Sequence, residues 1–382
     1  MNAKPDLREI ATTGGGRDIT RGFLSALLPP ADPVLTGRGG GDYALYQQVL
    51  SDDQVQATFQ QRREAVVARD WQVVPGADGP LDQAAADFVS AQLDHIGWDR
   101  VTRMMLFGVF YGFAVAECLW AERDGHIALD QIKVRDRRRF RFGGDGRLRL
   151  LTQRNPQGEE LPERKFWHFA TGADHDDEPY GLGLGHWLYW PVFFKRNALK
   201  FWLVFLEKFG QPTAKGIYPA GATETEIQKL REALGAIHAE TGIVLPEGVA
   251  IELIEASRSG TADYDTVHQR MNEAIAKIVL GQTMTTEDGS SRAQAEVHYT
   301  VRQDLVKADA DLVNESFSRG PARWLTEWNF PGAAIPRVVR HIEAEPDLRP
   351  RAERDRLLYE IGFRPSLAYV RNVYGEGWEE RG

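Results

Sequence analysis

The chain lacks several features that mark common classes of protein. Its 382 residues include a single cysteine, Cys118, which excludes internal disulfides and cysteine-rich zinc sites. Cys118 lies in an apolar stretch, so we expect a small buried side chain. The N-terminus has no apolar signal-peptide core, which predicts a protein made and used in a cytoplasm.

The chain also has fewer positive than negative side chains. The chain has 46 Lys and Arg against 55 Asp and Glu, a formal net charge of −9. This balance argues against a protein that coats nucleic acid, which needs a broad basic surface. It is compatible with a wall along which DNA slides without sticking.

No apolar run is long and uncharged enough to predict a membrane span. Residues 187–206 are rich in Trp, Phe and Leu, but Lys195, Arg196 and Lys200 lie near the middle of the run. Each cation would cost about 2.5–3.5 kcal/mol at a bilayer centre, whereas each Leu, Phe or Val gains only about 0.3–0.6 kcal/mol. We therefore predict a soluble helix and no membrane partner.

Motifs of nucleotide and nucleophile chemistry are missing. Gly181, Gly183 and Gly185 follow a GxGxG spacing, without the lysine or the leading strand that phosphate-binding loops have. Ser290 and Ser291 have no nearby histidine in a nucleophile motif. A phosphoryl-transfer enzyme is thus a weak alternative, and we predict no catalytic residues and no cofactor.

Metal-ligand patterns are equally sparse. The acidic segment 174–178 could ligate a hard cation, but a solvated loop is the simpler interpretation. His168 and His186 have no partners at ligand spacing. We predict no metal site.

The first part of the chain predicts a mixed α+β domain. Residues 1–42 carry glycine and proline breakers and predict a loose segment. Beyond them, Ser51 and Asp82 are candidate helix caps, and Trp71–Pro75 is a candidate strand. Residues 114–170 predict strands, with hairpin turns at Asp124–Gly125 and Gly143–Gly146.

The second part predicts long helices around a small unit. One helix runs to Phe209, starting late or kinking at Pro191. Short strands are expected at 215–218, 243–245 and 249–253, with a capping box at Thr223–Glu226. Further helices are expected on both sides of a polar loop at 281–293. A charged, weakly helical tail is expected from residue 337.

Seven arginines gather in a short stretch that predicts paired strands. Alternation places several of them on one face and Phe140 and Phe142 on the other. The arginine face could contact DNA or an acidic partner, although a solvated face is the simpler interpretation. The arginines are Arg135, Arg137, Arg138, Arg139, Arg141, Arg147 and Arg149.

Several blocks, in order, resemble the portal proteins of tailed bacteriophages, in particular the Mu-like branch. They cover about residues 45–330. The sharpest blocks are Tyr180-Gly-Leu-Gly, Tyr189-Trp-Pro, Phe205-Leu-Glu-Lys-Phe-Gly-Gln-Pro212 and Leu280-Gly-Gln-Thr-Met-Thr-Thr286, together with Asp52–Pro75 and Phe107–Glu117. The chain departs from this branch in its short C-terminal part and in the loop residues Glu287–Arg292.

The resemblance implies a homo-oligomeric ring, typically a dodecamer, at one vertex of a virion head. It implies packaging and ejection of double-stranded DNA, and partners that include terminase, a head–tail connector, and major capsid and scaffold proteins. A capsid scaffold or adaptor that forms no channel is the alternative. The implied portal-type map is a flexible segment (1–44), wing (45–183), first stem helix (184–209), clip (210–261), second stem helix (262–280), tunnel loop (281–293), tunnel helix and wing return (294–336) and reduced crown (337–382).

The resemblance also implies two groups of site residues. The stem residues that would face the lumen oppose an apolar stripe; they are Gln269, Asn272, Glu273 and Lys277. The loop residues that would face DNA are polar, and their carboxylates would keep DNA from sticking; they are Thr283, Thr285, Thr286, Glu287, Asp288, Gly289, Ser290, Ser291 and Arg292.

Overall fold

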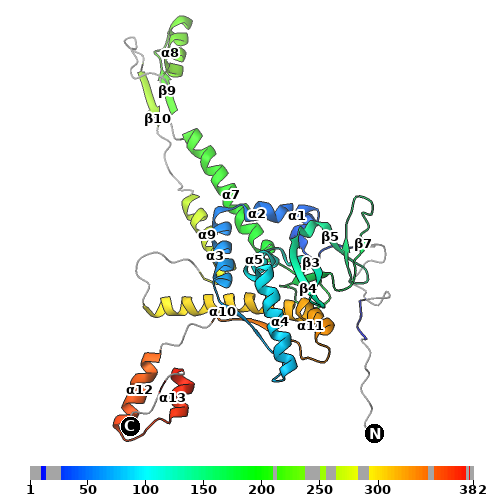
Figure 1. Ribbon diagram of the computed structural model, residues 1–382. Coiled ribbons are helices and arrows are strands. Elements are labelled where there is room, and N and C mark those ends of the chain that lie inside the picture. Colours follow the sequence, from blue (N-terminus) through cyan, green and yellow to red (C-terminus); the bar gives the residue numbers. More distant parts are fainter. Residues whose placement is uncertain are drawn as a thin grey trace, which may run out of the picture.

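The computed structural model describes residues 10–13, 27–209, 213–236, 250–254, 264–282, 292–342, 348–375 and 378. Its described parts combine helices with small antiparallel sheets, which agrees with the predicted α+β class. We call residues 27–183 with 292–342 the body, and residues 184–282 the extension. Figure 1 shows the extension rising from one side of the body.

The body is built from short helices packed around small sheets. Trp98, Trp167 and Phe317 meet at its centre, with Trp98 and Phe317 ring centroids 4.6 Å apart. Its first helices are α1 (Pro33–Gly39), α2 (Ala44–Leu50), α3 (Asp53–Val67), α4 (Pro80–Ile96), α5 (Trp98–Met105) and α6 (Phe107–Tyr111).

Three antiparallel sheets stabilise the body. One has the order β4-β3-β8, a second the order β1-β5-β6-β7, and a third joins β11 to β2. The turn at Asp124 and Gly125 has positive φ at both residues, as a two-residue hairpin turn requires. The strands are β1 (Leu27–Leu28), β2 (Trp71–Val74), β3 (Phe113–Arg123), β4 (His126–Arg135), β5 (Phe140–Gly143), β6 (Leu148–Leu150), β7 (Glu159–Glu160), β8 (Phe166–Ala170) and β11 (Arg337–Arg340), with a 3-10 turn η1 at Arg137–Arg139.

Two long helices form the base of the extension. Helix α7 (Leu184–Phe209) and helix α9 (Tyr264–Leu280) pack side by side (Figure 1). Beyond them lie β9 (Thr213–Ile217), α8 (Glu224–Ala236) and β10 (Ala250–Ile254), with β9 and β10 antiparallel. The predicted strand at 243–245 lies outside the described residues.

The rest of the chain returns through the body. Helix α10 (Arg292–Phe317) crosses the body below α9 and α3 in Figure 1, continues as a π turn η2 (Ser318–Ala322) and then as α11 (Arg323–Asn329). After β11, helices α12 (Leu348–Glu360) and α13 (Leu367–Tyr374) form a hairpin set apart from the body in Figure 1.

Most predicted elements are confirmed, but the caps differ. Asp52, not Ser51, caps α3, because its carboxylate accepts from the backbone N–H groups of Gln54 and Val55. Gly79 precedes α4, and Asp82 reaches back to accept its N–H at 3.0 Å. The capping box at Thr223 and Glu226 is confirmed, with Thr223 N–H donating to Glu226. Helix α7 begins well before Pro191, at Leu184.

The structure differs from the prediction in one segment predicted to be loose and at the start of the tail predicted to be weakly helical, whose later residues do form helices α12 and α13. Residues 33–39 form α1, because Asp32 caps it and Pro33 has the φ that suits a first helical position. Residues 337–340 form a strand and not a weakly helical tail, since Val338 and Arg340 turn buried side chains inward while the strand pairs with β2.

Candidate functional site: the joint between the extension and the body

Helix α7 is apolar on faces that the chain itself does not cover. Leu188 and Val192 are buried against the body, yet eight other large apolar side chains of α7 are more than one third exposed. They are Trp187, Trp190, Phe193, Phe194, Phe201, Leu203, Val204 and Leu206. Exposed apolar side chains in such number on one helix are typical of an interaction site.

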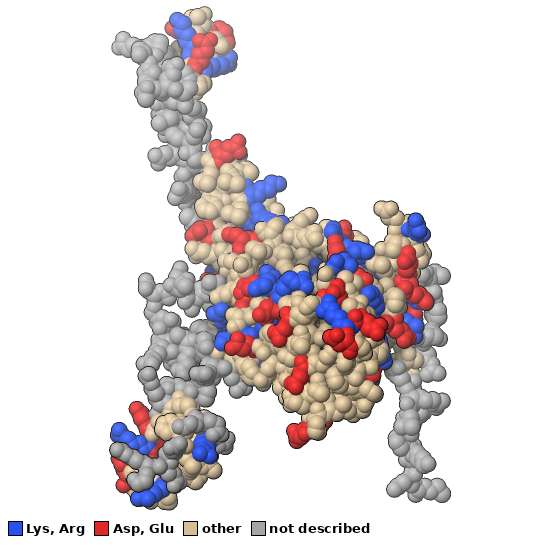
Figure 2. Space-filling model, in the orientation of Figure 1, with Lys and Arg blue, Asp and Glu red and all other residues tan. Residues whose placement is uncertain are grey.

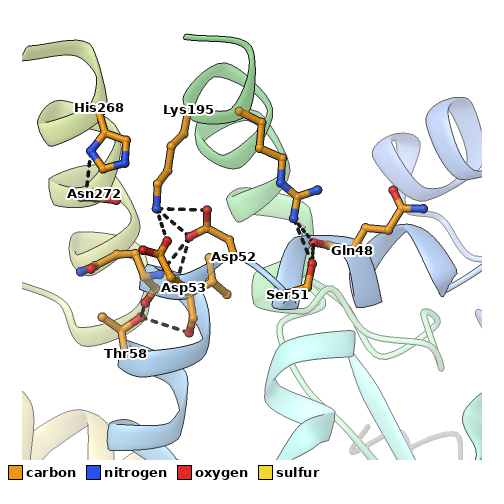
Figure 3. A network of polar contacts seen from close by, with 11 residues as sticks. Gln48, Ser51, Asp52, Asp53, Thr58, Lys195, His268 and Asn272 are labelled. Carbon is orange, nitrogen blue, oxygen red and sulfur yellow. Dashed lines mark hydrogen bonds and ion pairs between the residues drawn. The ribbon is translucent and has the colours of Figure 1, made fainter. Parts of the chain in front are cut away.

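Lys195 fixes the middle of α7 to the body. Its ammonium group is 2% exposed and lies 3.1 Å from the Asp52 carboxylate and 2.5 Å from the Asp53 carboxylate (Figure 3). Asp52 is also the cap of α3, so one lysine joins α7 to the start of α3. The hydrogen bond from Lys195 holds the pKa of Asp53 below its usual value.

Arg196 adds a second contact beside Lys195. Its guanidinium donates to the Gln48 carbonyl and to Ser51 Oγ, at the end of α2. On α9, His268 and Asn272 lie across from Lys195 in Figure 3, with Asn272 Nδ2 3.5 Å from His268 Nδ1. Helix α7 is thus attached to the body by specific polar contacts as well as by apolar packing.

Arg62 joins three helices where the extension returns to the body. It donates from Nε and Nη2 to the Asp309 carboxylate of α10, at 2.6 and 2.8 Å, and from Nη1 to the Val279 carbonyl of α9, at 2.7 Å. The Arg62 and Asp309 side chains are 9% and 5% exposed. Since Arg62 belongs to α3, it holds α9 and α10 on both sides of residues 283–291.

The structure describes the predicted stem residues but only one of the predicted loop residues. Gln269, Glu273 and Lys277 are exposed on α9, whereas Asn272 is half-buried and its Oδ1 has no partner among the described residues. The loop residues Thr283 to Ser291 lie outside the described residues. Arg292 is the first residue of α10.

The glycines at 181–185 serve close packing. A side chain at Gly181 would meet the Thr171 and Gly112 carbonyl oxygens at 2.3 and 2.4 Å. One at Gly183 would meet backbone atoms of Gly112 and Phe110 at 2.3 Å. This space is filled by the chain's own backbone, so the geometry gives no support to a phosphate-binding loop.

Most arginines between residues 135 and 149 have partners within the chain. Phe140 and Phe142 are buried, as predicted. Arg135 pairs with Glu117, Arg138 with Asp136, and Arg149 with Asp145 and Glu160. Arg137 lies 3.7 Å from the centre of the Tyr111 ring. Figure 2 shows basic and acidic side chains interspersed over this side of the body, which is typical of a solvated surface.

Two candidate reactive side chains, Cys118 and His168, are held in their neutral forms near pH 7. Cys118 is fully buried, and burial raises the pKa of its thiol to about 12. Burial lowers the pKa of His168 to about 4, so its imidazole is neutral near pH 7. In the described part of the chain, no group of three or more His, Cys, Asp and Glu side chains could hold a metal. Nor does that part include a helix long and apolar enough to cross a bilayer.

The fold matches that of proteins in the neck of gene transfer agent particles. A chain from the neck of the empty particle has a TM-score of 0.59 and 16% identity, covering 90% of this chain and 94% of that one. A chain from the virion of the native particle has a TM-score of 0.57 and 15% identity, covering 87% and 92%. At this identity the likeness shows the fold alone.

The sequence comparisons identify the family. The family model for the portal protein of Mu bacteriophage matches residues 43–376, so the chain belongs to that family. Mu-like prophage FluMu protein gp29 of Haemophilus influenzae (strain ATCC 51907 / DSM 11121 / KW20 / Rd) is 27% identical over 358 residues, 89% of this chain and 69% of the relative. The portal protein of Escherichia phage Mu is 27% identical over 280 residues. That alignment covers 70% of this chain and 53% of the phage Mu protein, so the chain spans about half of that relative.

Proposed function

We propose that the chain assembles into a closed homo-oligomeric ring, a dodecamer, whose channel passes DNA at one vertex of a virion head. The observation that carries the proposal is the exposed apolar surface of α7 on a helix that Lys195 and Arg196 fix in place. Family membership gives this surface its interpretation. Solved structures with the same fold include a particle neck computed with C12 symmetry.

The exposed surface of α7 is large enough to drive association. Full burial of one large apolar side chain contributes about 1.5–3 kcal/mol. Eight such side chains, each already about half covered, would contribute on the order of 10 kcal/mol when buried between neighbours. The cost of ordering α7 is low, because its base is already held by the body.

The portal-type map is part of the proposal. Helices α7 and α9 would be the stem, the β9–α8–β10 unit the clip, and the body most of the wing. Gln269, Glu273 and Lys277 are polar and exposed on α9, which suits a surface that faces a water-filled lumen. We place Asn272 with them, nearer the α7 side.

The 281–293 segment would be the tunnel loop. Arg62 holds the Val279 carbonyl, at the end of α9 that leads into the loop, which supports a loop that leaves the body at a fixed point. Its carboxylates, Glu287 and Asp288, would repel phosphates over a Debye length of about 8–10 Å. The loop would therefore let DNA slide rather than bind it.

The partners follow from this role. They would be double-stranded DNA in the channel, terminase and later a head–tail connector at the clip, and capsid and scaffold proteins at the wing. The ring would assemble in the cytoplasm of a bacterial host and end at the portal vertex of the virion. The role involves no cofactor and no catalysis.

Substitutions in α7 test the proposal. Replacing both Trp190 and Phe194 with Asp should abolish rings, because carboxylates cannot be buried between neighbouring helices. Leu81→Asp is the matched control: Leu81 is 47% exposed on α4, and its replacement should leave ring formation intact. Light scattering and negative-stain microscopy give the readout. Normal rings from the double variant would sink the assignment of α7 to the interface, and a wild type that never forms rings would favour a non-channel scaffold.

A further inference from the structure

Asn314 on α10 has a buried carboxamide that the described part of the fold does not satisfy. It is 2% exposed, and neither its Oδ1 nor its Nδ2 has a partner among the described residues. The groups around it are paired: Ser318 Oγ donates to the Asn314 carbonyl at 2.8 Å, and Val338 N–H donates to Ser318 Oγ at 3.2 Å. Unpaired buried polar groups are rare in folded proteins, so we expect the Asn314 carboxamide to have a hydrogen-bond partner from outside the described residues.

Asn314 is one of the residues that line a cavity at the surface of the body. The cavity has a volume of about 820 Å³ and lies between α10, the π turn η2, α11 and β11. Ile335 and Val338 form its apolar wall, and Arg319, Arg323 and Arg337 are among its charged lining residues. This volume is typical of ligand sites and far exceeds that of one bridging water. The π turn contributes Ser318 and Arg319 to the lining, and such turns often occur at functional sites.

Most charges around the cavity are paired with one another or with nearby groups. Asp311 pairs with Lys307, Glu315 with Arg319, and Glu327 with Arg323 and Arg164. Arg337 has no ion-pair partner among the described residues and is exposed. Its guanidinium can therefore donate hydrogen bonds to a carboxylate of another molecule.

We infer that this cavity docks an extended peptide segment of a partner protein. The segment pairs a backbone amide with the Asn314 carboxamide and places an acidic side chain against Arg337. A carboxamide offers an acceptor and donors side by side, which complements the C=O and N–H of a peptide group. An aliphatic residue next to the acidic one packs on Ile335 and Val338. The inference does not depend on ring formation, because every residue in it belongs to one subunit.

A blocked dipeptide tests the inference on the full-length protein. N-acetyl-aspartyl-valine methylamide should bind in ligand-detected NMR titrations, and Asn314→Leu and Arg337→Glu should each weaken its binding about tenfold or more, the effect of one good hydrogen bond or charge pair. N-acetyl-valine methylamide, without the carboxylate, should bind more weakly and respond only to Asn314→Leu. Arg147→Glu, a charge reversal on the exposed end of the β5–β6 hairpin, should have no effect.

Specific outcomes overturn the inference. One is no binding of the dipeptide, and another is equal binding to the wild type and both pocket variants. A third is a short DNA duplex that binds and depends on Arg337, which would make the site one for nucleic acid. Stability gives an independent check: Asn314→Leu should leave the urea midpoint unchanged or higher. A lower midpoint would mean that ordered water already satisfies the carboxamide.

Discussion

Replacing Arg62 with Leu should loosen the point where α3, α9 and α10 meet. The change leaves the Asp309 carboxylate, 5% exposed, without its cation, and removes the donor to the Val279 carbonyl. Breaking a buried pair by removing one partner costs about 3–5 kcal/mol. We expect the free energy of unfolding to fall by that amount.

A double variant separates charge from packing. In Arg62→Leu with Asp309→Leu neither charge of the pair stays buried, and such apolar replacements of buried ion pairs are often close to neutral. Only the Val279 carbonyl loses its donor, at a cost of about 1 kcal/mol. The double variant should therefore be more stable than Arg62→Leu alone by about 2–4 kcal/mol.

Urea unfolding followed by tryptophan fluorescence gives the measurement, since Trp98 and Trp167 lie in the core. The control is Arg319→Leu, whose partner Glu315 is 56% exposed; breaking such a pair should cost less than about 0.5 kcal/mol. An Arg62→Leu cost no greater than that of the control would refute the proposed clamp. A double variant less stable than Arg62→Leu would refute the argument from an unpaired charge.

Three further predictions concern single groups. Lys195→Met should raise the pKa of Asp53 toward its ordinary value, because the lysine hydrogen bond that lowers it is lost; carboxyl NMR titration should show this, and an unchanged pKa would mean that Lys195 is not the cause. The pKa of His168 is about 4 in the fold against an ordinary value of 6.5, so its contribution to stability is complete above pH 6.5 and is lost as pH falls toward 4. The loss should be up to about 1.4 kcal/mol per pH unit, and His168→Phe should flatten that slope in urea unfolding; a slope that persists would point to other groups. Replacing Glu287 and Asp288 with Lys should slow DNA passage, most at low salt, and packaging rates equal to the wild type would contradict the sliding mechanism.

The regular elements were predictable because local patterns decide them. The aromatic run of α7, the apolar spacing of α9 and the turn at Asp124–Gly125 all led to the observed structures. Pro191 misled the start of α7: it is the eighth residue of the helix and leaves the Trp187 carbonyl without its helical N–H donor, yet the helix continues through it.

The joint could not be predicted, because it depends on pairs distant in sequence. Lys195 and Asp52 are 143 residues apart, and Arg62 and Asp309 are 247 apart. A signal was present: each cation interrupts an apolar helix face, where a charge is stable only with a partner. The sequence does not say which carboxylate that partner is. The site residues at 283–291 stay predictions, since they lie outside the described residues.

Electron cryomicroscopy of the purified chain, combined with a native mass measurement, tests the central claim most directly. The account predicts a closed ring with twelvefold symmetry, a mass twelve times that of the subunit, and a central channel lined by α9 with α7 between neighbouring subunits. A well-folded chain that stays monomeric at high concentration, or a ring whose α7 faces solvent, would contradict it.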